Sequence, residues 1–212
     1  MSSIFSEIDR VFVIVCSKAT TAPFNLNDMP GSAGRMDLVC RFIAQVIFVS
    51  HGVRKDSMAI AVLKGEPDPP KAILVKGNEV RYMAPDERNI GGLIRKALSV
   101  NFKSGEQIGW VRSTPGIYVA RKNLKDVLSE LEDGGYRIYY LKENGEDIRS
   151  VEFGKKLAFV LGDHLGLSEE DEKIVEAYAD VTVSLSPISL QADQCVVIVH
   201  YELDRSASRV HF

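Results

Sequence analysis

The sequence predicts an α/β sandwich in which helices cover a parallel sheet, and two features indicate this class. First, residues 10–16 (RVFVIVC), 58–63 (MAIAVL) and 72–76 (AILVK) are continuous apolar runs, as in strands that are buried on both faces. Second, residues 35–50 lie between the first two runs and repeat apolar side chains at helical spacing. This β–α–β order is typical of α/β folds.

The middle of the chain continues the alternation of helices and strands. One helix is predicted over residues 86–99, where Asp86 is a favourable first capping residue. Another is predicted over residues 123–134, with Asn123 as its cap. Residues 136–141 (YRIYYL) then predict a further strand, so the second half repeats the pattern of the first.

Two loops near the C-terminus have compositions that suit a pocket wall. The first follows a strand end at residues 159–161, and its Gly162 permits close backbone approach. The second, residues 184–191, is expected to connect two strands, Val181–Val183 and Val196–Val199. Its serines and its proline are also common in plain turns, and that alternative stays open.

These loops are expected to meet at one edge of the sheet. In open α/β sheets, ligands bind outside the carboxyl ends of the strands. Leu141, Gly162 and the segment from Ser184 onward each follow a predicted strand. They are therefore candidates for one shared binding site.

Composition limits the classes of protein to consider. The chain has 212 residues, 45% of them hydrophobic, which is ample for a single domain over residues 1–212. Its three cysteines are far apart and form no metal-binding spacing, so we expect a reducing cytoplasm and no metal. The apolar runs are much shorter than the roughly 20 residues of a membrane span, and no secretory segment is evident.

Charge and motifs exclude several functions. A net charge of −3 argues against a general polyanion binder, although basic residues cluster locally. The sequence contains no GxGxxG after the first strand, no GxxxxGK[ST], no GxSxG and no HExxH. The four histidines are scattered, and for each of them, including His164 and His200, a surface or hydrogen-bonding role is a commoner explanation than catalysis.

Five segments together resemble the archaeal TrmY family. In chain order they are PGSAGRMDLVCR (30–41), SHGVRKD (50–56), RYMAPDERNIGGLIRKAL (81–98), LGDHLGLSEEDE (161–172) and SLSPISLQADQCVVIVHYELDR (184–205). Members of this family are SPOUT-class enzymes that use S-adenosylmethionine to methylate N1 of pseudouridine at position 54 of tRNA. The resemblance covers nearly the whole chain.

The resemblance implies a SPOUT-type parallel-sheet sandwich with a C-terminal trefoil knot, which together with the cofactor loops lies between residues 136 and 205. It also implies a homodimer. Periodicity gives no indication of a knot, since true knots are rare. Carried over by position, the residues that bind S-adenosylmethionine are expected to be Leu141, Gly162, Leu185, Ser186, Pro187, Ile188, Ser189, Leu190 and Cys195.

The implied reaction requires alignment of the methyl group with N1 and removal of the N1 proton. A carboxylate suits the second task, and our candidate for the general base is Asp56, which follows Arg54 and Lys55 in a polar loop. An equally good explanation of Asp56 is that it braces the turn before the strand at residues 58–63. Asp86 is a second candidate, but a helix cap explains it more simply.

Binding of tRNA is expected to involve basic side chains that contact phosphate, although exposed charges are common on any surface. The candidates are Arg54, Lys55, Arg81, Arg88 and Arg95. Two other functions remain open. One is methylation of pseudouridine in another RNA such as rRNA, and the other is a non-enzymatic RNA-binding factor that has lost the cofactor.

Overall fold

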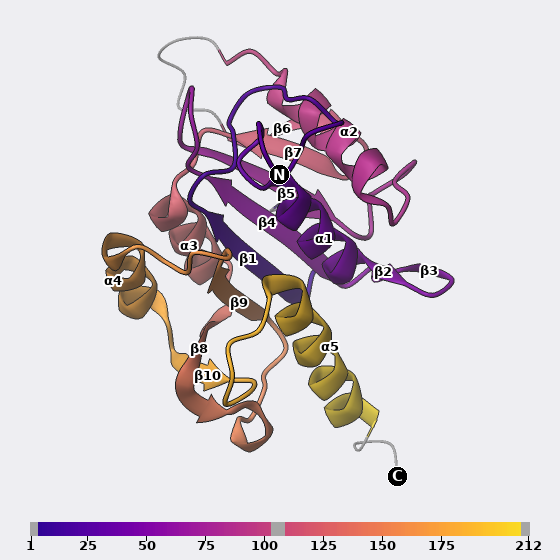
Figure 1. Ribbon diagram of the computed structural model, residues 1–212. Helices are drawn as coiled ribbons and strands as arrows, with labels where there is room; N and C mark the ends of the chain where they lie inside the picture. The colour runs from indigo at the N-terminus through magenta and orange to yellow at the C-terminus, as the bar shows by residue number, and fades with distance from the viewer. Residues whose placement is uncertain (1–3, 103–108, 209–212) are drawn as a thin grey trace.

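The computed structural model describes residues 4–102 and 109–208, which form an α/β sandwich around an eight-stranded sheet (Figure 1). In spatial order the strands are β10 (Val181–Ser184), β8 (Arg137–Asp147), β9 (Leu157–Gly162), β1 (Arg10–Cys16), β4 (Ser57–Leu63), β5 (Lys71–Lys76), β7 (Ile117–Ala120) and β6 (Val111–Thr114). The helices are α1 (Met36–Ile47), α2 (Glu87–Leu98), α3 (Leu124–Asp133), α4 (Glu169–Tyr178) and α5 (Ala192–Ser208), with a 3-10 turn η1 (Ile148–Ser150) after β8. A separate small hairpin joins β2 (Phe48–Val49) and β3 (Gly52–Val53).

The sheet has a parallel half and an antiparallel half. Strands β10, β8, β9, β1 and β4 are parallel, and Arg10 of β1 lies in register with Ser57 of β4 and Leu157 of β9. Strands β5, β7 and β6 continue the sheet in antiparallel pairs beyond β4. The carboxyl ends of the five parallel strands therefore lie along one edge of the sheet.

Strand β1 illustrates why helices cover both faces. Phe12 and Ile14 pack into a core with side chains of α1, α2 and α5, whereas Val11 and Val13 pack into a second core with α3 and α4. All four side chains are fully buried. Successive side chains of a strand point to opposite faces, so a continuous apolar run requires a layer on each side. Within the part of the chain that the structure describes, no helix combines the length and the apolar character needed to cross a membrane.

Local sequence signals predicted most of these elements correctly. The predicted α/β sandwich is confirmed, and the predicted strands before residue 142 correspond to β1, β4, β5 and the first part of β8. The predicted caps are confirmed as well. Asp86 accepts a hydrogen bond from the backbone N–H of Asn89 at the start of α2, and Asn123 accepts one from Asp126 at the start of α3.

The prediction of a strand at Val196–Val199 is wrong, because this run lies in α5. Val196, Val199 and Leu203 are buried while Val197 is 48% exposed, which is the one-sided pattern of a surface helix. A four-residue apolar run is compatible with either structure, and packing of α5 against α1 selects the helix. The loop after β10 therefore joins a strand to a helix.

The antiparallel half of the sheet was not predicted. Strands β6 and β7 are four residues each, and β6 (VRST) is a largely polar edge strand that lacks a strong apolar signal. The direction of β5 could have been inferred from loop length. Residues 64–70 are too few for a parallel crossover, which takes a dozen or more residues.

Candidate active site

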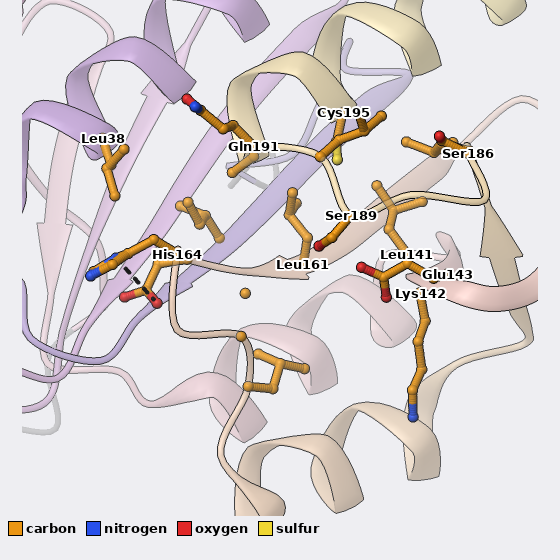
Figure 2. Close-up of a pocket in the computed structure, with 18 of the residues that line it drawn as sticks. Leu38, Leu141, Lys142, Glu143, Leu161, His164, Ser186, Ser189, Gln191 and Cys195 are labelled. Carbon is orange, nitrogen blue, oxygen red and sulfur yellow. Dashed lines mark ion pairs between the residues drawn. The ribbon is translucent and has the colours of Figure 1, made fainter.

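A cavity of about 590 Å³ opens at the carboxyl ends of β1, β8 and β9 and is bordered by the segment between β10 and α5 (Figure 2). This volume lies within the roughly 300–1,000 Å³ typical of small-molecule sites. Much of the wall is aliphatic. The aliphatic residues that line it are Ile14, Leu38, Leu141, Leu161, Leu167, Leu185, Ile188, Leu190 and Ala192.

Strand β8 reaches into the cavity because its pairing with β10 is interrupted. Thr182 and Val183, which are consecutive in β10, pair with Tyr140 and Glu146 of β8. The segment 141–145 is therefore looped out of the ladder, as in a large bulge. Its first three residues line the cavity.

Gly162, the last residue of β9, lies against the turn formed by residues 163–166. A Cβ atom at Gly162 would be 2.5 Å from the carbonyl carbon of Gly166. Any other residue at this position would clash with the turn, so the turn requires a glycine here. The Gly166 N–H donates to the Asp163 carbonyl (2.9 Å), and Gly166 has a φ of 75°. The close approach predicted for Gly162 is thus made by backbone of the same chain.

The residues predicted to bind the cofactor lie together. All of them except Pro187 line this one cavity, although they come from β8, from β9, from the segment before α5 and from the first turn of α5. Leu141, Gly162 and the residues after Ser184 therefore lie around one cavity, and their binding of the cofactor stays a prediction.

Cys195 lies in the first turn of α5, where its N–H donates to the Gln191 carbonyl (3.0 Å). Burial raises the pKa of its thiol to about 11, and the nearby carboxylates of Glu143 and Asp193 add to the shift. The thiol is therefore protonated at neutral pH. Its position is that of a small wall residue, in a helix and not in the predicted strand.

Two carboxylates of the cavity are held by hydrogen bonds. Glu172 of α4 forms an ion pair with Lys142 and accepts a hydrogen bond from the Tyr140 hydroxyl (3.1 Å), and both interactions lower the pKa of Glu172. Glu143 accepts a hydrogen bond from Ser189, which lowers its pKa too. In Figure 2, Glu143 and Ser189 lie close together.

Two arginines border the cavity beside α1. Arg35, which has a left-handed φ of 68°, donates to both oxygens of Asp37 (3.1 and 3.0 Å), and Arg41 donates to Asp37 (3.1 Å) and to Glu87 of α2 (3.2 Å). The Asp37 side chain is 5% exposed. Burial opposes ionisation of this carboxyl, but the arginines outweigh burial and lower its pKa. A buried carboxylate thus fixes two guanidinium groups at the cavity edge.

Asp56 lies at the opposite end of the sheet. Its carboxylate accepts a hydrogen bond from the Ser57 hydroxyl (3.0 Å) and lies 3.4 Å from Nε of Arg10, at the amino ends of β4 and β1. Seven-residue β1 spans roughly 20 Å, which separates Asp56 from the cavity of its own chain. The geometry fits the alternative of a carboxylate that braces the turn before β4, and the role of Asp56 as general base stays a prediction.

Arg54 is engaged in the fold. Its guanidinium donates to both carboxylate oxygens of Asp204 (3.2 and 2.7 Å), and its side chain is 20% exposed. Arg10 donates to the same carboxylate (2.6 Å). This arrangement ties α5 to the amino ends of β1 and β4 and gives Arg54 a structural role, while its contact with RNA stays a prediction.

The other predicted phosphate contacts are exposed. Lys55 precedes β4, Arg81 lies in the loop after β5, and Arg88 and Arg95 lie on α2. Arg88 donates to the Asn27 side chain (3.0 Å). None of these four side chains lines the cavity.

Sequence reasoning did not select several polar residues of the cavity, namely Arg35, Arg41, Lys142, Glu143, Asp163, His164, Glu172 and Gln191. A signal for some of them was present. Lys142 and Glu143 directly follow the apolar run at 136–141, and Asp163 and His164 directly follow β9. Polar residues at the carboxyl ends of buried strands are the expected place for ligand contacts.

Comparison with known proteins gives a consistent result. The family model for SAM-dependent RNA methyltransferases matches residues 9–208. The chain is 46% identical over 201 residues to a Methanococcoides burtonii protein named tRNA (pseudouridine(54)-N(1))-methyltransferase, covering 94% of this chain and 98% of that protein. It is 44% identical over 202 residues to a Methanococcus aeolicus protein of the same name, covering 92% and 97%. The crystal structure of Archaeoglobus fulgidus Nep1 bound to S-adenosylhomocysteine has the same fold, with a TM-score of 0.63 and 15% identity over 95% of this chain and all of that one.

Proposed function

Because the chain belongs to the family of SAM-dependent RNA methyltransferases, we propose that it transfers a methyl group from S-adenosylmethionine to N1 of pseudouridine 54 in tRNA. The observation that carries this proposal is the near full-length similarity to two proteins with that name, combined with a cavity at the strand ends. Pseudouridine has a free N1–H where uridine is bonded to ribose. N1 is therefore a nucleophile that uridine does not offer.

The cavity fits S-adenosylmethionine in size and in chemistry. Leu141, Leu161 and Leu185 supply aliphatic surface of the kind that packs against an adenine ring, and the looped-out backbone of residues 141–145 supplies hydrogen-bonding groups. The Glu143 carboxylate lies in the same wall and complements a cationic ligand, whereas Glu172 is paired with Lys142. These features support cofactor binding by the residues predicted from the resemblance.

When bound, the cofactor supplies an electrophilic methyl group on a sulfonium sulfur. The chain contributes binding and orientation. Residues 185–190, Leu141 and Gly162 would enclose the adenosine part, and Cys195 would form the wall behind it. Such a site increases the rate by holding the methyl carbon in line with N1, at a distance of about 3–3.5 Å.

We further propose that Lys55, Arg81, Arg88 and Arg95 contact phosphates of the tRNA. Their exposure to solvent supports this role. Since the net charge is −3, binding must depend on local positive patches and not on the charge of the whole chain.

A homodimer is part of the proposal. Val197 and Tyr201 of α5 are 48% and 53% exposed, and they lie in the helix whose first turn borders the cavity. A second copy would bury this apolar surface and would bring two basic patches together. The location proposed is the cytoplasm, which suits a tRNA substrate and the three free cysteines.

We also infer that the chain is one SPOUT domain with a trefoil knot between residues 136 and 205. Two contacts support this. Helix α5 packs on α1, and Glu202 of α5 accepts a hydrogen bond from Arg149 of η1 (3.1 Å), so the last helix lies against the β8–β9 connection (Figure 1). This is the place where a knotted chain would pass through that connection.

Paired tRNA transcripts test the function directly. One transcript carries pseudouridine at position 54 and the other carries uridine, and each is incubated with the protein and S-adenosylmethionine before products are mapped by mass spectrometry. We expect a methyl group at N1 of the pseudouridine transcript and no product with the other. Equal methylation of both transcripts contradicts the proposal. Cofactor binding without product would favour another pseudouridine-containing RNA such as rRNA, and no cofactor binding would favour the non-enzymatic factor.

A further inference from the structure

We propose that His164 accepts the N1 proton of pseudouridine during methyl transfer. This inference rests on the proposed function and supplies a base for it, since Asp56 lies at the far end of the sheet. His164 lines the cavity in the turn after β9, on the same side as Leu38 of α1 (Figure 2). Its side chain is 32% exposed, so a substrate can reach it from the cavity.

The carboxylate beside His164 is fixed by the backbone. Oδ2 of Asp163 accepts a hydrogen bond from the Ser17 N–H and Oδ1 accepts one from the Leu165 N–H, both at 2.8 Å. The Asp163 side chain is 4% exposed, and its Oδ1 lies 3.8 Å from Nδ1 of His164. A fixed carboxylate near Nδ1 stabilises the imidazolium that forms when Nε2, on the other side of the ring, takes up a proton.

Other titratable groups of the cavity are poor bases. Glu172 is shared between Lys142 and Tyr140, and Glu143 accepts a hydrogen bond from Ser189, so both carboxyls have lowered pKa values. The Cys195 thiol is protonated because burial raises its pKa to about 11. Both oxygens of Asp163 accept backbone hydrogen bonds and its side chain is 4% exposed, and burial raises the pKa of the Tyr140 hydroxyl. Among the described residues that line the cavity, this leaves the His164 imidazole, the type of side chain that exchanges protons most readily near neutral pH.

The titratable and charged groups near this turn come from three segments. Asp163 belongs to the turn itself, Arg35 precedes α1 and interacts electrostatically with Asp163, and Cys16 ends β1. Burial, and then the charge of Asp163, raise the pKa of the Cys16 thiol, which is therefore neutral. The Asp163 carboxylate is thus the charged group beside His164, and Arg35 interacts with that carboxylate.

The proposed step is complete without a further reactant. The N1 lone pair forms a bond to the methyl carbon, and the carbon–sulfur bond breaks with its electron pair remaining on sulfur. The N1 proton passes to Nε2 of His164. The products are N1-methylpseudouridine, S-adenosylhomocysteine and an imidazolium that releases its proton to water.

His164→Gln tests the inference, because glutamine keeps hydrogen-bonding groups but cannot take up a proton. With the pseudouridine transcript, we expect kcat to fall about 100-fold, the typical contribution of a general base. Dissociation constants for cofactor and tRNA should stay within about twofold, since the base contributes mainly in the transition state. The rise of wild-type kcat/KM with pH below neutrality should disappear in H164Q.

His51→Gln is the matched control. His51 is exposed between β2 and β3 and does not line the cavity, so H51Q should keep the wild-type rate and pH profile. A second variant, His164→Gly, should regain part of its rate when imidazole is added to the buffer.

Several results would overturn the inference. These are an H164Q enzyme with wild-type kcat, an H164Q enzyme that is slow but keeps the wild-type pH profile, or an H164G enzyme that imidazole does not activate. Failure of the proposed function looks different, because the wild-type protein itself would then form no product from the pseudouridine transcript.

Discussion

At the scale of single residues, His200 has a structural role in joining α5 to the sheet. It is 3% exposed, its ring lies 4.7 Å from that of Phe12, and Nδ1 lies 3.2 Å from the Arg10 guanidinium. Nε2 lies 3.3 Å from the Val46 carbonyl oxygen, which can only accept, so Nε2 carries the proton and Nδ1 accepts from Arg10. The neutral ring satisfies both neighbours.

This arrangement predicts acid-sensitive stability. Burial, followed by the charges of Arg54 and Arg10, lowers the pKa of His200 from 6.5 to about 3. The unfolded chain therefore binds a proton below pH 6.5 that the folded protein does not, and stability is lost as pH falls from 6.5 toward 3. Between pH 7.5 and pH 5 the loss from this residue should be about 2 kcal/mol.

Urea unfolding at both pH values measures the effect. His200→Gln removes the titration, so its unfolding free energy should change about 2 kcal/mol less between pH 7.5 and pH 5 than that of the wild type, whatever its absolute stability. Few carboxyl groups titrate above pH 5, so their contribution is small in this range. Equal pH dependence in both proteins would show that His200 is not held neutral.

At the scale of elements, α3 has a complete capping box. The Asn123 side chain accepts from the Asp126 N–H, and the Asp126 carboxylate accepts from the Asn123 N–H, both at 2.9 Å. Helix α3 buries its apolar face on the side of the sheet that faces away from α1 and α5, and it contributes no residue to the cavity. Its cap therefore affects stability and not binding.

Asn123→Ala should lower the free energy of unfolding by about 1 kcal/mol, within the 0.5–2 kcal/mol usual for a lost cap. Cofactor affinity should stay unchanged. Lys125→Ala, an exposed substitution in the first turn of the same helix, is the control and should stay within about 0.5 kcal/mol of the wild type. A cofactor affinity that falls with N123A would mean that α3 is coupled to the site.

At the scale of the whole molecule, the cavity joins residues far apart in the chain, from Ile14 in β1 to Cys195 in α5. A ligand that binds there holds these segments together and stabilises the entire fold. At 100 times its dissociation constant, S-adenosylmethionine should add about 2.7 kcal/mol to the stability and raise Tm accordingly.

Gly162→Ala should remove this ligand-dependent rise in Tm and should lower Tm without ligand. The added Cβ would lie 2.5 Å from the Gly166 carbonyl carbon, so the turn beside the cavity would have to shift. Gly154→Ala is the matched control, since a Cβ there has no neighbour within 4 Å, and it should keep both the Tm and the rise. If S-adenosylmethionine raised the Tm of G162A as much as that of the wild type, this would contradict the assigned role of this turn.

The sequence predicted those features that depend on residues close together along the chain. Buried strands were recognisable from runs such as 10–16, and caps from single side chains such as Asp86 and Asn123, because both signals are local. The expected pocket at the strand ends also followed, since parallel strands bring their carboxyl ends to one edge. Resemblance, and not periodicity, supplied the enzyme class and the cofactor.

Other features depend on contacts between distant segments, which no local pattern contains. Packing against α1 makes Val196–Val199 helical, and pairing with Asp204 occupies Arg54. Asp56 follows a polar loop in the sequence, but strand direction places it about 20 Å from the cavity. His164 lies within the cavity for the same reason, because β9 runs parallel to β1 and delivers the turn after it to the edge where the ligand site forms.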